Sequence, residues 1–541
     1  MRAGFAKSLD HDLDVLRRGA NDAALSATLQ QLLASGGDHR LKLDPMTLLN
    51  GYGCRPFPRP EAFTFASSTA TSISDRAFAR TRLARLDLLR AAKPHGVSDA
   101  LNKRIEQMRY LLKAQLRLDA GIDVVFSPSG TDTQLHALFV AKSILGARCT
   151  SVVAAADETG SGTAFVSEGR HFADVTAQGA AVTKGDHVSG FGGMPGRIPV
   201  CLRDERGVLR DQGAVDLDIV QSIASVIAEG GRVLLHAMDH SKCGFRSPSL
   251  ECLQEVTARW PESVLVLMDA CQMRLARPRL GSYLNSGFLV AITGSKFFTG
   301  PPFSGALLMP GRLSQLLIGV QIAPGLCDYM NQSDWPMRLW NIRTQLPDRH
   351  NLGQWLRWEA ALEEMRAYFA VPEAPRRDML DRFAGFVRSR ISGSRCLRLL
   401  PARSEPVSEL DSEFPPETIF PFTLHRHESE LTRDDCARVY RLLNEDVSDR
   451  LSDTALPRQR AIAARPCHIG QPVTLRQANG SETGALRVSA GARIVSDNWS
   501  PDEDCRQRNF ASELKQISTV FDKIELLIAD ENIWAEHAPI L

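Results

Sequence analysis

Three short segments carry side chains that could act together in chemistry. In FSPSGTDTQLHAL, the turn Ser129-Gly130-Thr131 separates an apolar run from a helical stretch, so free N–H groups and the helix dipole can attract a phosphate. Asp269 directly follows the apolar run SVLVLM, where a carboxylate needs a cationic partner. Lys296, in AITGSKFF, lies just past another apolar run and could act as an amine nucleophile.

Each of these segments has an ordinary explanation when it is taken alone. SGT before a helix is typical of a helix N-cap, a strand-end aspartate can be satisfied by loop amides, and most lysines lie at the surface. Taken together, the three segments indicate a binding site, because all three follow predicted strands and therefore gather at one edge of a sheet. Together they match the needs of pyridoxal phosphate: a helix N-terminus for the phosphate, a carboxylate that keeps the ring nitrogen protonated, and a lysine that forms an imine.

The segments SGTDT, DACQ and TGSK also resemble elements of a known family. They are similar to the SGATE, D-A-x-Q and S-G-H-K elements of fold-type I pyridoxal-phosphate enzymes, and most closely to those of the class V aminotransferase and cysteine desulfurase group. The resemblance extends from about Phe65, where FASSTATS is similar to the group's N-terminal turn, to about Arg493. It implies a large domain with a mostly parallel mixed sheet, a smaller α+β domain, and a homodimer, because the group's sites lie at a subunit interface.

The resemblance implies roles for five further residues. Gln272 would hydrogen-bond the phenolic oxygen of the cofactor, and Ser241 stands where the group has an asparagine that serves the same oxygen. Thr293 and Ser295 would place hydroxyls on the phosphate. Arg487, in GALRVSAGAR, matches the arginine that clamps the substrate α-carboxylate, a task that suits a bidentate guanidinium.

The chain departs from the group's pattern in two places. Where the group has a histidine that stacks on the pyridine ring, this chain has Glu158-Thr159. In ARPCHIGQPV, Ile469 falls at the place of the desulfurases' nucleophilic cysteine, His468 is retained, and Cys467 lies two residues away. Because a reactive thiol must be accessible and ionised, Cys467 is a candidate for sulfur transfer only through a shifted loop.

The resemblance implies an enzyme that acts on a small α-amino acid. Lys296 would hold the cofactor and then move the substrate's α-proton, while Asp269 keeps the ring an electron sink. Aminotransferase or Cα/Cβ lyase chemistry is the first expectation; sulfur transfer and amino-acid decarboxylation are the alternatives. A non-catalytic relative is disfavoured by the retained lysine and aspartate. A nicotinamide enzyme is disfavoured because no GxGxxG turn is followed by an acid about 20 residues on.

The elements that must position these residues alternate along the chain from Asp123 onward. Short apolar runs are separated by helical stretches, which is typical of strands buried on both faces of a mostly parallel sheet. Two amphipathic helices are expected before them, over 74–92 and 98–118. The sequence therefore predicts an α/β fold with strands over 123–127, 150–156, 232–238, 263–268, 287–293 and 304–309.

Domain boundaries follow from where this alternation starts and stops. Residues 1–60 are expected to form a helical leader that ends in a Gly/Pro-rich stretch, and residues 61–334 the cofactor-binding large domain flanked by helices. Residues 335–541 are expected to form the smaller α+β domain. Its expected elements are a long helical region over 352–391, a strand in FPFTLH, a helix over 434–443 and a strand in ALRVSA.

Composition disfavours several other classes of function. Among 541 residues, 64 Lys and Arg nearly balance 63 Asp and Glu, so a nucleic-acid partner is not expected. The longest apolar runs are far shorter than the ~18 residues of a membrane span, so no membrane association is expected. Eleven dispersed cysteines without CxxC pairs are typical of reduced thiols in the cytoplasm. His425 and His427 lack a third ligand at a recognisable spacing, so no metal site is expected.

Overall fold

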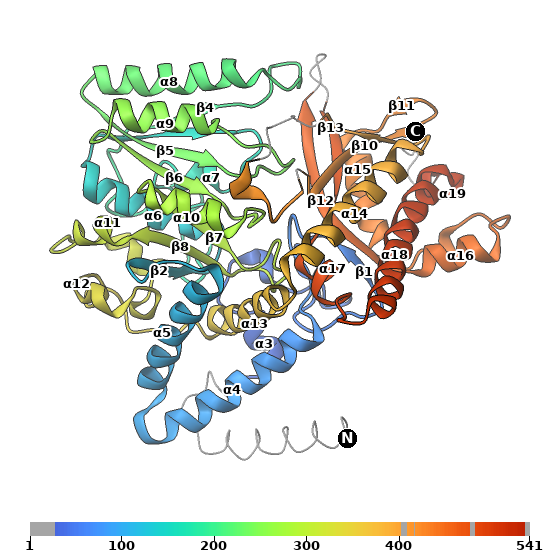
Figure 1. Cartoon of the computed structure of the whole chain (residues 1–541), viewed down its shortest axis with the longest axis horizontal. Coiled ribbons are helices and arrows are strands. Elements are labelled where there is room, and N and C mark those ends of the chain that lie inside the picture. Colours follow the sequence, from blue (N-terminus) through green and yellow to red (C-terminus); the bar gives the residue numbers. More distant parts are fainter. Residues whose placement is uncertain (1–26, 402–407, 416, 477–481, 536–541) are drawn as a thin grey trace.

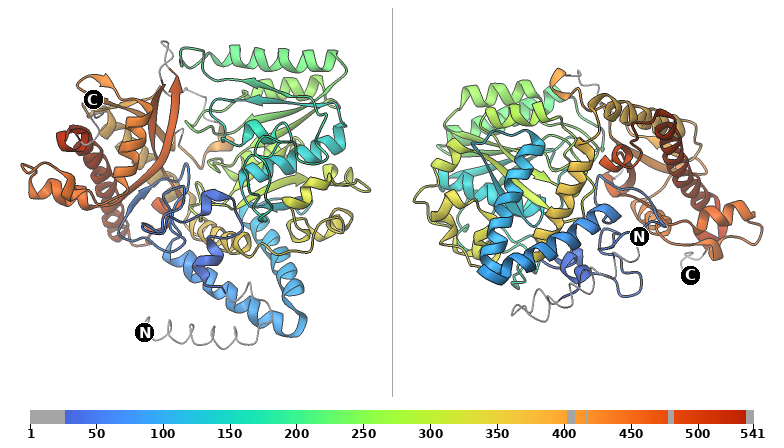
Figure 2. Two further views of the ribbon diagram at one scale, coloured as in Figure 1. Left: turned by 180° about the vertical axis from the view of Figure 1, so that it is seen from behind. Right: turned by 60° about the horizontal axis from the view of Figure 1, so that its bottom comes forward.

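Two β-sheets lie side by side in the computed structural model, each covered by helices (Figure 1). The structure describes residues 27–401, 408–415, 417–476 and 482–535. The views of Figure 2 show the same separation from behind and from below, with α4 (Asp75–His95) and α5 (Val97–Leu116) beneath the larger sheet. These two helices confirm the pair predicted before the first strand.

The larger sheet has seven strands in the order β2-β8-β7-β6-β5-β3-β4. Strand β8 runs antiparallel to both of its neighbours, and the pairs from β7 to β4 are parallel. The sheet is therefore mixed and mostly parallel, as predicted. Its strands are β2 (Ile122–Ser127), β3 (Cys149–Ala154), β4 (Arg197–Val200), β5 (Arg232–Met238), β6 (Val264–Asp269), β7 (Leu289–Thr293) and β8 (Gly305–Pro310).

Both faces of this sheet are buried, which explains why its strands are almost wholly apolar. In β2, Val124 and Phe126 pack on one face, whereas Val125 packs on the other. The first face is covered by α8 (Gln212–Ala228), α9 (Leu250–Arg259), α10 (Arg277–Asn285) and α13 (Leu352–Phe369), and the second by α6 (Gly130–Leu145). Successive side chains of a strand point to opposite faces, so a strand covered on both sides needs no polar alternation.

All six predicted strands of the large sheet are present, and one strand was not expected. Strand β4 lies at the edge of the sheet, pairs only with β3, and contains Pro199. Three of its four residues are partly or fully exposed, so it lacks the continuous apolar run that identified the others. A proline is tolerated at such an edge because one side of the strand needs no ladder hydrogen bonds.

The second sheet has the order β1-β12-β13-β10-β11, with β9 also paired to β10. Three helices pack on it: α14 (Glu373–Ser392), α15 (Arg433–Leu443) and α18 (Glu503–Ala529). The strands are β1 (Phe63–Phe65), β9 (Leu397–Leu399), β10 (Ile419–Arg426), β11 (Ser429–Glu430), β12 (Cys467–Arg476) and β13 (Glu482–Ser489). The predicted strands in FPFTLH and ALRVSA and the helix over 434–443 are confirmed as β10, β13 and α15.

Two expectations about the second half of the chain need correction. The helical region over 352–391 is two helices, because Pro372 cannot continue α13 and instead caps α14. The segment ARPCHIGQPV, considered above as a catalytic loop, enters strand β12 at Cys467, between β1 and β13.

The described part of the leader contains two short helical segments, α3 (Leu29–Leu33) and η1 (His39–Leu41), and is otherwise turns and extended chain. Residues 1–26 lie outside the described residues. The remaining helices of the described chain are short: α7 (Thr163–Val166), α11 (Gly311–Gln315), η2 (Pro324–Asp328), η3 (Gln332–Asp334), η4 (Met337–Leu339), α12 (Trp340–Arg343), η5 (Glu409–Asp411), η6 (Ser448–Arg450), α16 (Pro457–Ala464), α17 (Ala492–Ser496) and α19 (Glu531–Ala535).

Candidate active site

A cavity of about 370 Å³ lies between the two sheets, at the C-terminal ends of β5, β6 and β7. This edge of an open α/β sheet is where ligands gather. Ser241 lies between two residues that line the cavity, His240 and Lys242, but does not line it itself. The other nine predicted site residues line this one cavity: Ser129, Gly130, Thr131, Asp269, Gln272, Thr293, Ser295, Lys296 and Arg487.

The predicted phosphate turn lies at the N-terminus of α6. Ser129 is the N-cap, and its hydroxyl accepts a hydrogen bond from the Asp132 N–H (3.2 Å). A β-carbon at Gly130 would lie 2.8 Å from Cys271 Sγ, so a larger residue at that position would force the turn or the Cys271 side chain to shift. The first N–H groups of α6 therefore face the cavity edge with the positive end of the helix dipole, which suits an anion.

Asp132 is a feature of this turn that sequence reasoning missed. Its side chain is buried, one carboxyl oxygen contacts the Ser129 hydroxyl (2.5 Å), and the other has no hydrogen-bond partner among the described residues. Burial raises the pKa of Asp132 to about 7, partly opposed by the bond from Ser129. The carboxyl is therefore mostly neutral only below this pH, where a phosphate can bind beside it with little repulsion.

Asp269 ends β6 and points into the cavity without a cationic partner. One carboxyl oxygen accepts from the Gln134 side-chain amide (2.8 Å), and the other accepts from the Cys271 N–H (3.0 Å). Within the described chain, no ion pair joins it to a lysine, arginine or histidine. Two neutral donors fix the orientation of the carboxylate but leave its charge available to a positively charged ligand group such as a protonated ring nitrogen.

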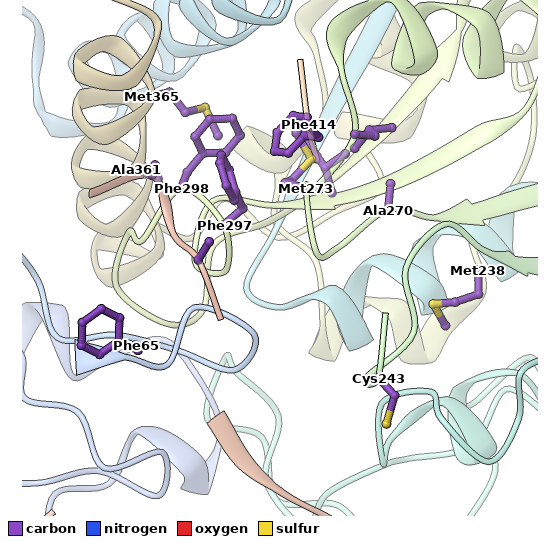
Figure 3. Packing of buried hydrophobic residues seen from close by; sticks show 14 of the residues in the cluster. Phe65, Met238, Cys243, Ala270, Met273, Phe297, Phe298, Ala361, Met365 and Phe414 are labelled. Carbon is purple, nitrogen blue, oxygen red and sulfur yellow. The ribbon is translucent and has the colours of Figure 1, made fainter. Parts of the chain in front are cut away.

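Lys296 lies in the turn after β7, and its neighbours hold that turn rigidly. The Phe297 ring packs edge-on against the rings of Phe298 and Phe414, and Figure 3 labels these three rings together with Ala361 of α13, which belongs to the same apolar cluster. The Phe297 and Phe414 ring centroids are 5.0 Å apart. In contrast to these buried rings, the Lys296 amine lines the cavity and makes no hydrogen bond or ion pair with a described residue. A fixed backbone with an unpartnered amine is what a nucleophilic lysine needs.

The two hydroxyl residues before Lys296 line the same part of the cavity. Thr293 donates a hydrogen bond to the Cys271 carbonyl (2.7 Å), which leaves its oxygen able to accept or share a further bond. Ser295 is 7% exposed and its hydroxyl makes no hydrogen bond to another described residue. Both side chains are therefore available for the predicted phosphate contacts.

Gln272 and Ser241 have protein partners already. The Gln272 amide donates to the Ser68 carbonyl (3.1 Å) and accepts from Arg274 (3.3 Å), so both ends of its side chain are held. Ser241 donates to Glu158 (2.5 Å) and accepts from the Phe245 N–H (3.0 Å). Ser241 thus orients the Glu158 carboxylate beside the cavity.

Glu158, which replaces the expected histidine, is tied to Arg203. Their ion pair is 3.0 Å long and Glu158 is 2% exposed. Thr159 also lines the cavity, next to Glu158. In this chain an ion-paired carboxylate and a small hydroxyl side chain therefore occupy the region where the resemblance implied a stacking ring.

Arg487 reaches the cavity from β13 of the second sheet. Its guanidinium donates to the carbonyls of Gln471 (2.7 and 3.0 Å) and Lys242 (3.0 Å) and to the Thr69 hydroxyl (3.1 Å). No carboxylate pairs with it among the described residues, and burial lowers its pKa from the ordinary arginine value. Neutral oxygens position the guanidinium, but an anion would be needed to balance its charge.

Several cavity residues have no counterpart among the predicted ones. Lys242 lies near Lys296 and Arg487, and burial together with these two cations lowers its pKa to about 8. Arg40 and Tyr52, from the leader, also line the cavity; Arg40 is paired with Asp38 (2.6 Å). The Gly/Pro-rich composition at the end of the leader predicts a loop, but it does not indicate that this part of the chain reaches the cavity.

His240 lines the cavity at the end of β5, with a carboxylate behind it. Its Nδ1 lies 2.6 Å from Asp239, which also accepts from the Tyr283 hydroxyl (2.8 Å). Burial disfavours the charged form of Asp239, but the contacts with His240, Arg246 and Tyr283 outweigh burial and lower its pKa. The pair is local to this loop and leaves the other imidazole nitrogen available.

Cys467 does not line the cavity. Its side chain is 0% exposed at the start of β12, and its thiol donates to the Arg465 carbonyl (3.4 Å). Burial raises the pKa of the thiol to about 11, which disfavours the thiolate needed for sulfur transfer. Within the described chain, no group of three or more His, Cys, Asp or Glu could hold a metal ion, and no helix is long and apolar enough to cross a membrane.

Comparisons with known proteins identify no family by sequence. No family model matches the chain, and no curated protein matches it. Solved structures similar to it include a NifS-like protein (13% identity, 84% of this chain and 99% of that one, TM-score 0.45). A second is a glutamate decarboxylase domain from Vibrio parahaemolyticus (12% identity, 87% of this chain and 81% of that one, TM-score 0.48). A third is tryptophan decarboxylase from Catharanthus roseus (13% identity, 88% of this chain and 85% of that one, TM-score 0.47). Likenesses this distant leave the function to be argued from the cavity's own residues.

Proposed function

We propose that the protein is a pyridoxal-phosphate-dependent enzyme that acts on a small α-amino acid. The observation that carries this proposal is the meeting in one cavity of three groups without a counter-charge: the amine of Lys296, the carboxylate of Asp269, and the N-terminus of α6. Each meets one need of the cofactor, which when bound supplies an electron sink for a carbanion at the substrate α-carbon. A structural role alone requires none of the three to remain without a counter-charge.

The residues that would hold the cofactor lie at one edge of the larger sheet, after the C-terminal ends of β2, β6 and β7. The Ser129-Gly130-Thr131 turn would hold the phosphate with its N–H groups, and the hydroxyls of Thr293 and Ser295 would add further donors. Asp269 would bind the ring nitrogen and keep it protonated. Gln272 would contact the phenolic oxygen with its side-chain amide. We assign Ser241 an indirect part, through the Glu158 carboxylate that it orients.

Lys296 and Arg487 would act on the substrate. Arg487 would hold the α-carboxylate with two parallel N–H groups, which fixes the α-carbon near Lys296. The Lys296 amine would bind the cofactor covalently, and once a substrate amine has displaced it, the same amine would remove and return the α-proton. A carboxylate held in this way favours reactions that retain it, so aminotransferase or lyase chemistry remains our first choice and decarboxylation the alternative.

We further propose a homodimer that works in the cytoplasm. The dispersed thiols support the compartment, and the resemblance to the class V aminotransferase group supports the dimer. Light scattering of the purified protein on a sizing column tests the dimer directly, since a mass of one chain at micromolar concentration would contradict it.

The experiment that tests the cofactor is an absorption spectrum before and after borohydride reduction, followed by peptide mapping. We expect a visible band that borohydride removes and a reduced cofactor attached to Lys296. The variant Lys296→Ala should fold but show neither, whereas Lys93→Ala, at an exposed position of α4, should behave as the wild type. No band after added pyridoxal phosphate, or label on another lysine, would refute the assignment.

A further inference from the structure

Two positive charges in the cavity remain without a counter-charge. The Arg487 guanidinium contacts only uncharged oxygens, and the Lys242 ammonium makes no hydrogen bond or ion pair with a described residue. The two are joined at the backbone, because Arg487 donates to the Lys242 carbonyl (3.0 Å). Two neighbouring cations that are partly removed from water repel each other, and burial and Arg487 together lower the pKa of Lys242. This end of the cavity therefore favours an anionic ligand.

The acidic side chains near Lys242 are already committed. Glu158 is paired with Arg203 (3.0 Å) and accepts from Ser241 (2.5 Å). Asp269 faces the ring-nitrogen position and is held by Gln134. The Cys243 thiol is buried, and burial keeps its pKa above the ordinary value, so it is neutral. No protein anion is thus left for Lys242 within the described chain.

The cofactor's phosphate belongs to the other end of the cavity. The Ser129-Gly130-Thr131 turn packs against Cys271 and Thr293, at the ends of β6 and β7, whereas Lys242 follows β5, on the other side of β6. A single phosphate at the N-terminus of α6 would therefore leave Lys242 without a partner. The ligand that neutralises Lys242 must be a different anion.

Resting on the proposed function, we propose that the substrate is an α-amino acid with a second anionic group, bound by Lys242 while Arg487 holds the α-carboxylate. Two anionic groups on one small molecule would match the two unpaired cations. The hydrogen bond from Arg487 to the Lys242 carbonyl keeps these two residues at a fixed position relative to each other. Lys242 is then the residue that determines specificity. A carboxylate, a sulfonate and a phosphate share the chemistry that would bind here, and they differ in size and charge.

The test is isothermal titration calorimetry with matched pairs of amino acids. L-aspartate is compared with L-asparagine and L-glutamate with L-glutamine, and L-cysteate and O-phospho-L-serine separate the three kinds of anion. We expect the wild type to prefer at least one acidic member by on the order of 10- to 100-fold, the range of a hydrogen bond to a charged group. Lys242→Met should reduce this preference to about onefold, and Lys242→Arg should keep most of it. Lys93→Met, at an exposed site, is the control.

The outcomes separate this inference from the function on which it rests. Loss of the visible band overturns the cofactor, whatever the calorimetry shows. A normal band with equal affinity for the acidic and neutral members of every pair overturns only the substrate class. A Lys242→Met variant that binds the cofactor weakly but keeps the preference would assign Lys242 to the cofactor and also overturn the inference.

Discussion

The two ends of the cavity are lined by different kinds of chemical group. At the proposed phosphate end, backbone N–H groups and hydroxyls converge from turns that follow β2 and β7 of one sheet, and Arg40 nearby is already paired with Asp38. At the other end, Lys242 and Arg487 come from different sheets and carry charge without a counter-ion. The contrast teaches that a site can hold two kinds of ligand group in different ways. The cofactor phosphate, which is the same in every reaction, would be bound by residues of one sheet. The anionic groups of the substrate, which determine specificity, would be bound by residues from both sheets.

The largest expected effect comes from Asp269, which would serve the cofactor and not the choice of substrate. Asp269→Asn keeps the size of the side chain but removes the charge that would hold the ring nitrogen protonated. We expect turnover to fall about a hundredfold or more, the loss seen when one preorganised electrostatic contact is removed, with the band on Lys296 and the preference among amino acids retained. Steady-state kinetics on the substrate found by calorimetry measures the loss; Asp453→Asn, at an exposed site, is the control.

Gly130→Ala should damage the phosphate end alone. The new methyl group would lie 2.8 Å from Cys271 Sγ and push the turn away from β6. Overpacking of this kind costs roughly 1–3 kcal/mol, so the affinity for pyridoxal phosphate should fall about tenfold or more. Gly385→Ala, in α14, adds the same methyl group where it meets nothing, and should leave affinity unchanged. If Gly130→Ala altered the preference between aspartate and asparagine, this would contradict the proposal that the two ends of the cavity bind their ligand groups independently.

The two ends should also respond differently to pH. Asp132, with a pKa raised by burial to about 7, becomes an anion beside the phosphate turn as the pH rises through that value. Cofactor affinity should therefore fall between pH 6 and 8 by a few-fold more in the wild type than in Asp132→Asn. Lys242, with a pKa lowered to about 8 by burial, Arg487 and Lys296, loses its charge as the pH rises through that value. The preference for acidic amino acids should then weaken, and Lys242→Arg should not show this.

The smallest effect is expected at Cys467, which lies outside both ends. Cys467→Ser can keep the hydrogen bond to the Arg465 carbonyl, and the thiol is buried away from the cavity. We expect unchanged turnover and a melting temperature lower by a few degrees, since a hydroxyl is less well suited to this apolar site. Loss of turnover without loss of stability would support the sulfur-transfer alternative.

The parts of the site that follow strands could be predicted because of a simple geometric rule. Parallel strands end at one edge, so Asp269 and Lys296 had to lie near the Ser129 turn once their apolar runs were identified as strands. Strand β12 was missed because Gly470 and Pro472 interrupt its apolar pattern. The break between α13 and α14 could have been predicted from the proline there, since the residue before a proline avoids helical geometry.

Other site features depend on long-range contacts that a local pattern does not contain. Lys242 is one of eleven lysines in the sequence, and only the approach of Arg487 from the second sheet makes its position unusual. Arg40 and Tyr52 lie in a stretch without periodicity, so nothing local indicates that it folds over the cavity. The raised pKa of Asp132 depends on burial, which a single sequence does not report.

The turn over residues 66–69, which directly follows β1 and is closed by a hydrogen bond from the Thr69 N–H to the Ala66 carbonyl, affects the order in which the molecule can assemble. The Ser67 hydroxyl bonds Ser489, 422 positions later in the chain, and the neighbouring strand β1 pairs with β12. During synthesis, the larger sheet can form once β8 has emerged, but the cavity stays open on one side until β13 arrives and joins the turn. Nascent chains would therefore carry the lysine and the phosphate turn without the wall that holds them. Stable cofactor loading should therefore await the synthesis of β13.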